Sequence, residues 1–138
     1  IQISIFPLYA QIMVFDSQAS EFPEWTADLP CVASDEALFI ATHPDTEGNV
    51  AIEVCDSSEL RTSEEWTLIF DGSLKCSSHM LQVGNIPAGE LVDIPLATKG
   101  LVGVKTYVKP LDAPDTVKIV LTEGAITKPK IKSYGALR

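Results

Sequence analysis

The sequence predicts an all-β fold: a two-sheet antiparallel β-sandwich of jelly-roll-like form, with about eight or nine strands. Apolar residues recur with a period of two, which is typical of strands that have one face in a core and one in water. Turn-forming residues recur between these short runs. The 138 residues suit one domain, which we place at residues 1–123, followed by a polar, basic C-terminal tail at 124–138.

Three runs are apolar at successive positions and therefore predict central strands that are covered on both faces. They span residues 9–15, 37–41 and 66–70. The alternating runs predict half-buried strands, and the residues that share one face of each strand are Val50, Ile52, Val54, Val102, Val104, Thr106, Val108, Val117, Ile119 and Leu121. We expect Trp66, Leu68 and Phe70 to join this core. Truncation of one core residue to alanine should cost about 2–4 kcal/mol.

Turn chemistry separates the runs. Asp71-Gly72 is a strong hairpin signal between residues 66–70 and 74–83. Residues 45–49 are expected to close another strand pair, and residues 86–89 and 110–115 mark further breaks. The one helix candidate, residues 57–65, is short.

Composition excludes several classes of function. There are 19 acidic and 10 basic residues, for a net charge of −9, which argues against nucleic acid or an anionic membrane as a direct partner. No run approaches the roughly 18 apolar residues that a membrane helix needs. Three widely spaced cysteines favour a reducing compartment, so we expect a cytoplasmic location. Since the sequence begins at Ile1 rather than Met, a removed signal peptide stays an alternative.

The acidic residues are distributed unevenly along the chain. Residues 1–60 contain eleven acids and no Lys or Arg, and the first base is Arg61. This asymmetry predicts a negative surface, which serves either solubility or the binding of a cationic protein partner. Homo-oligomer formation is left open.

The long connection at residues 16–36 suits a partner-binding role because loops of this length in compact domains are often functional. Trp is enriched at binding hot spots, and carboxylates around it can pair with Lys or Arg. The alternative is that Trp25 folds the loop onto the sandwich. The candidate partner-binding residues are Glu21, Phe22, Glu24, Trp25, Asp28, Asp35 and Glu36.

Catalytic motifs are not found in the sequence, and we predict no catalytic residue, no metal site and no cofactor. The two histidines, His43 in a turn and His79 in a strand run, accompany no nucleophile-elbow motif. Asp45, Glu47 and Asn49 alternate like calcium ligands but lack the spacing of a calcium loop. An enzyme on a jelly-roll scaffold is therefore disfavoured.

Several short motifs resemble the competence protein J family, also called DNA-entry nuclease inhibitors. They are the opening run Tyr9 to Phe15, the stretch Pro23-Glu-Trp25-Thr26, the Ala-rich pair Ala33 to Ala41, the run Val50 to Val54 and the turn Pro87-Ala-Gly89. The resemblance covers most of residues 1–122, although Leu91 stands where the family often has an aromatic residue. It implies an all-β sandwich that binds a DNA nuclease and blocks it, in DNA uptake or as an immunity protein against a toxin.

The sequence thus favours an inhibitor that occludes the basic active site of a nuclease by protein–protein contact. The alternative is a ligand- or carbohydrate-binding β-sandwich module without catalytic activity. Such modules usually show several exposed aromatic residues on one face, whereas this chain has two Trp and three Tyr.

Overall fold

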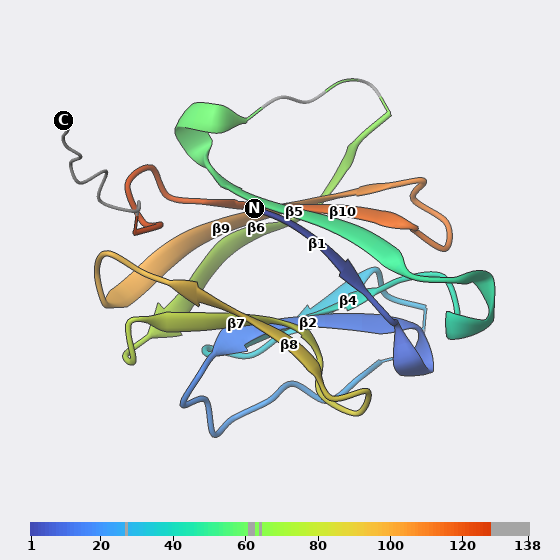
Figure 1. Ribbon diagram of the computed structural model, residues 1–138, viewed down its shortest axis with the longest axis horizontal. Helices are drawn as coiled ribbons and strands as arrows, with labels where there is room; N and C mark the ends of the chain where they lie inside the picture. The colour runs from blue at the N-terminus through green and yellow to red at the C-terminus, as the bar shows by residue number, and fades with distance from the viewer. Residues whose placement is uncertain (27, 61–62, 64, 128–138) are drawn as a thin grey trace, which may run out of the picture.

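A computed structural model describes residues 1–26, 28–60, 63 and 65–127. Two five-stranded sheets face each other as a β-sandwich (Figure 1), which confirms the predicted class with ten strands in place of eight or nine. The strand order is β1-β5-β10-β9-β6 in the first sheet and β3-β4-β2-β7-β8 in the second.

The strands are short and the helical elements are single 3-10 turns. The strands are β1 (Gln2–Ile5), β2 (Gln11–Asp16), β3 (Cys31–Ala33), β4 (Ala37–Ala41), β5 (Val50–Asp56), β6 (Thr67–Cys76), β7 (Met80–Asn85), β8 (Glu90–Pro95), β9 (Gly100–Lys109) and β10 (Thr116–Leu121). The 3-10 turns are η1 (Leu8–Ala10), η2 (Asp45–Glu47) and η3 (Ser57–Glu59). One neighbouring pair, β5 with β10, is parallel, whereas the sequence predicted antiparallel sheets throughout.

The core lies between the sheets and follows from the period-two pattern. All six predicted positions on β5 and β10 are buried: Val50, Ile52, Val54, Val117, Ile119 and Leu121. The second sheet contributes Ile12 and Val14 from β2, with Leu38 and Ile40 from β4. Runs 9–15 and 37–41 indeed provide interior strands, although Tyr9 itself lies in η1 and is exposed.

Strand β6 contradicts three sequence-based predictions. It lies at the edge of the first sheet rather than at its centre, so Leu68 is 45% exposed and Trp66 is only half-buried. Phe70 is also half-buried, but it packs against the core as predicted. Asp71-Gly72 is no hairpin turn, because β6 continues through it and pairs with β9 on both sides. A Cβ on Gly72 would lie 2.8 Å from Cζ of the Phe70 ring, so the ring would have to shift to admit a larger residue.

The other turn predictions have mixed outcomes. Residues 86–89 and 110–115 do connect antiparallel neighbours, β7 with β8 and β9 with β10. Residues 45–49 instead carry the chain from one sheet to the other, so they close no strand pair. The predicted helix at 57–65 is reduced to η3, with residues 61, 62 and 64 outside the described part. His79 lies at a turn with φ 62° and not within a strand.

The described fold extends past the predicted domain boundary at residue 123. Ala125 is buried in the core, and Ile126 forms a β-bridge with Leu96. Residues 128–138 of the predicted tail lie outside the described residues. Within the described ranges, no helix has the length and apolar character needed to cross a bilayer.

Thr106 offers a direct test of the core. Its side chain is fully buried on β9, and its Oγ1 has no hydrogen-bond partner among the described residues. An unpartnered buried hydroxyl costs about 1–3 kcal/mol, and valine has nearly the same volume. We expect Thr106→Val to raise the free energy of unfolding by about 1 kcal/mol in urea denaturation. A loss of stability would show that the hydroxyl is satisfied in solution.

Candidate functional site

A groove of about 680 Å³ opens at one end of the sandwich. Four segments meet there: η1, the later part of the loop between β2 and β3, the end of β4, and the β9–β10 turn. Of these, η1 and the β9–β10 turn are seen toward the right of Figure 1. The groove is lined by residues 9–10, 25, 28–30, 41–42, 108 and 111–114. Three other hollows on the described residues measure only about 150, 170 and 310 Å³, so we take this groove as the candidate site.

Exposed apolar side chains are concentrated around this groove. Tyr9 is 72% exposed and Trp25 is 42% exposed, and Leu29 and Leu111 are also largely exposed. Two aromatic rings and two leucines at one opening form the kind of apolar patch that marks an interaction site.

The charge of the groove is negative. Asp28 and Asp112 are both exposed there, and among the described residues no Lys or Arg lines it. A face of this composition suits a cationic group, because the carboxylates attract it and the rings offer their negative π-faces.

The backbone around the groove is unusual. Five described residues other than glycine have positive φ, and four of them line this groove: Tyr9 (63°), Ala10 (59°), Asp28 (70°) and Ala113 (52°). Such conformations cost free energy and persist where the surrounding structure enforces them, which occurs most often at functional sites.

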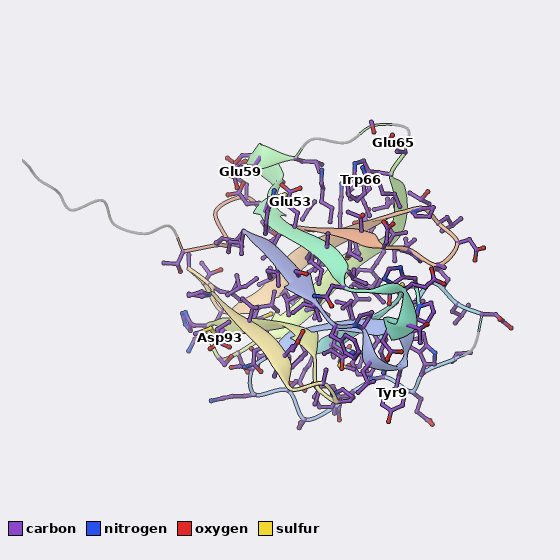
Figure 2. All side chains as sticks on the ribbon, turned by 45° about the vertical axis from the view of Figure 1, so that its right-hand side comes forward. Tyr9, Glu53, Glu59, Glu65, Trp66 and Asp93 are labelled. Carbon is purple, nitrogen blue, oxygen red and sulfur yellow. The ribbon has the colours of Figure 1, made fainter. Side chains whose placement is uncertain are left out.

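Buried hydrogen bonds hold η1 in this conformation. The fully buried Asn85 donates through Nδ2 to the carbonyl oxygens of Leu8 and Gln11, both at 2.9 Å. The backbone N–H of Thr42 donates to the Ala10 carbonyl at 3.0 Å. Tyr9 is therefore presented on a fixed turn, and Figure 2 shows it at the edge of the molecule.

The loop between β2 and β3 is anchored at its start. The Glu36 carboxylate accepts the backbone N–H groups of Ser20 and Glu21 at 3.0 and 3.2 Å. The Phe22 ring packs on Phe15 and Phe39, with centroid separations of 5.7 and 6.1 Å. Phe22 and Glu36, predicted to bind a partner, thus hold the loop against the outer face of the second sheet.

The structure brings two of the seven predicted site residues, Trp25 and Asp28, to the groove. Glu21, Glu24 and Asp35 are exposed outside it, and their role in binding stays a prediction. Trp25 is neither fully buried nor fully free, so a structural role and a binding role both remain compatible with its 42% exposure.

Sequence reasoning missed four groove residues: Tyr9, Leu29, Leu111 and Asp112. Tyr9 was assigned to a strand, and the last two belong to a segment that carries only turn signals between Pro110 and Pro114. These residues come from three segments that are far apart in the chain, so only the closed sandwich places them at one opening.

The acidic surface is smaller than the eleven acids of residues 1–60 suggest. Asp16 and Asp56 are buried. Asp16 accepts the N–H and Oγ–H of Ser78 at 3.2 and 2.7 Å, so it fixes the β6–β7 turn. Glu53 lies 3.7 Å from the buried ammonium of Lys118.

Trp66, predicted to be in the core, instead covers the outer face of the first sheet. The ammonium groups of Lys109 and Lys118 lie 4.4 and 4.6 Å from the centre of its ring. Figure 2 shows Trp66 and Glu53 on this side, away from Tyr9. The second Trp of the chain therefore takes no part in the groove.

The cysteines show no sign of nucleophilic chemistry. Burial raises the pKa of Cys31 and of Cys55, and burial together with the nearby Asp16 carboxylate raises the pKa of Cys76 to about 12. The thiols are free and protonated at neutral pH. Among the described residues, no three His, Cys, Asp or Glu side chains gather as metal ligands.

The fold and this groove define a β-sandwich with an acidic, aromatic opening at one end. No protein-family model matches the chain, and no curated protein matches it. Among solved structures it is similar to ComJ from Bacillus subtilis, described as an inhibitor of the DNA degrading activity of NucA. The TM-score is 0.66 at 17% identity, covering 88% of this chain and 94% of that one. The likeness shows a shared fold, and it supports the resemblance to the competence protein J family.

Proposed function

We propose that this chain is a protein inhibitor that binds a DNA-degrading nuclease and covers its basic active site. The observation that carries the proposal is the composition of the groove. Trp25, Tyr9, Asp28 and Asp112 line it, and no Lys or Arg is among its described lining residues. The fold shared with ComJ, described as an inhibitor of the DNA degrading activity of NucA, supports it further.

The mechanism is occlusion. A nuclease binds the phosphates of DNA with Lys and Arg side chains, which form a positive cleft. Carboxylates of the groove and of the neighbouring loop take the places of phosphates, while exposed aromatic rings exclude water and slow dissociation. The inhibitor acts by stoichiometric binding, and it performs no reaction and uses no cofactor.

The experiment is capture followed by a DNA-degradation assay. The chain is immobilised, incubated with a lysate of its source organism, and the eluted proteins are assayed on linear DNA with and without free chain. We expect DNA-degrading activity in the eluate and its loss when free chain is added back at equimolar amounts. An eluate without such activity, or activity that is unaffected by excess chain, contradicts the proposal.

Charge reversal near the groove should slow association. We expect Glu24→Lys combined with Asp28→Asn to reduce the association rate about tenfold at low salt, because charged faces steer encounter. Asparagine is chosen at position 28 because it tolerates the positive φ. The difference should shrink in 1 M salt, where the Debye length falls to about 3 Å.

Surface plasmon resonance at several salt concentrations measures this effect. The matched control, Glu59→Lys with Glu123→Gln, changes the net charge equally at exposed positions outside the groove. Equal slowing by both double variants would mean that the acidic residues act only through net charge.

A second candidate, a carbohydrate-binding module, is favoured by one observation. The groove volume of about 680 Å³ lies within the range of small-molecule sites, and its two aromatic residues could stack on sugar rings. Calorimetric titration with a panel of oligosaccharides distinguishes the two: saturable heat that Trp25→Ala abolishes supports the module, and its absence leaves the inhibitor.

A further inference from the structure

We propose that the groove receives an arginine side chain carried on a protruding loop of the partner protein. This inference rests on the proposed function and names what enters the site. This end of the molecule is thus a specific binding site for one planar cation, and not only a negatively charged surface.

The side chains that line the groove determine which kind of chemical group can bind there. Its charged side chains are Asp28 and Asp112, both acidic, and its aromatic side chains are Tyr9 and Trp25. A guanidinium group satisfies both kinds of wall at once, since it stacks on aromatic faces and pairs with a carboxylate through two parallel hydrogen bonds. A lysine ammonium is a strongly hydrated point charge that cannot stack in this way.

The size and rim of the groove indicate a loop. About 680 Å³ holds more than one side chain, so residues that flank the arginine can enter with it. Leu29 and Leu111 are exposed at the opening and offer apolar contact to those neighbours. The walls of the groove come from four segments far apart in the chain.

The groove is also organised before binding. Asn85 and the Thr42 N–H hold the turn that carries Tyr9, and the His43 N–H donates to the Pro114 carbonyl at 2.9 Å beside Asp112. A site already held in strained backbone conformations loses little conformational entropy when it is filled.

The test uses Trp25 as the reporter. In a Trp66→Phe background Trp25 is the single tryptophan, and phenylalanine keeps an aromatic ring near the ammonium groups of Lys109 and Lys118. The probe is acetyl-Gly-Arg-Gly-amide, titrated while tryptophan fluorescence is recorded. We expect a saturable change at millimolar peptide, with at least tenfold weaker binding of the citrulline peptide, which has the same shape without the charge.

Two further variants locate the binding. Asp112→Asn should weaken binding of the arginine peptide at least fivefold. Glu123→Gln, two residues past the end of β10 and outside the groove, should leave the affinity unchanged. Equal binding of the citrulline peptide, an unsaturable change, or equal weakening by Glu123→Gln overturns the inference.

The outcomes separate this inference from the proposed function. If the chain inhibits DNA degradation but no arginine peptide binds, the inhibitor docks by other contacts and the inference alone is wrong. If the peptide binds at the groove but no nuclease is captured or inhibited, the groove is a cation-binding site and the proposed inhibitor function is wrong.

Discussion

Replacing Trp25 by alanine is expected to weaken inhibition of the nuclease by about 30- to 700-fold, corresponding to about 2–4 kcal/mol for a hot-spot tryptophan. The ring is 42% exposed in the free chain and lines the groove, so a partner can bury what remains. The loss should appear mainly as faster dissociation. Surface plasmon resonance and the DNA-degradation assay measure it.

The same variant should fold normally, because Trp25 belongs to neither buried core cluster. Trp66→Phe is the matched control, since it alters the other tryptophan on the outer face of the first sheet. It should leave inhibition unchanged. If Trp25→Ala inhibits as well as the wild type, the groove is not part of the binding surface. If the variant shows a large drop in melting temperature, the ring has a structural role.

Ile119→Ala is expected to lower the free energy of unfolding by about 2–4 kcal/mol, because the side chain is fully buried between the sheets. Leu68→Ala is the comparison that the structure provides. Both residues are predicted as core from the sequence, but Leu68 is 45% exposed on an edge strand, so its truncation should cost less than about 1 kcal/mol. Urea denaturation measures both, and equal losses would contradict the placement of β6.

The period-two pattern predicted the core because alternation is a local consequence of strand geometry. Val54 and Ile119 face inward for the same reason that their sequence neighbours face outward. The pattern failed on β6, where a bulge between Leu68 and Phe70 shifts the register against β9. One extra residue reverses which side chains face the core, and the sequence carries no separate signal for it.

The groove was only half predictable. The long loop and its Trp25 were visible as an unusual connection, and Asp28 lies with it. Tyr9 and Asp112 reach the same opening through the packing of the two sheets, which no spacing in the sequence records. The count of acidic residues overstated the surface charge because Asp16 is satisfied internally by Ser78, a contact between residues far apart in the chain.

The proposed inhibitor acts by occupying the cleft with which the nuclease binds DNA. Initial rates of DNA cleavage by the captured nuclease, measured over a matrix of DNA and inhibitor concentrations, test it most directly. Occupation of the DNA-binding cleft predicts competitive inhibition, in which the apparent inhibition constant rises in proportion to DNA concentration above its KM. No inhibition at any ratio, or an inhibition constant that stays the same at every DNA concentration, would contradict it.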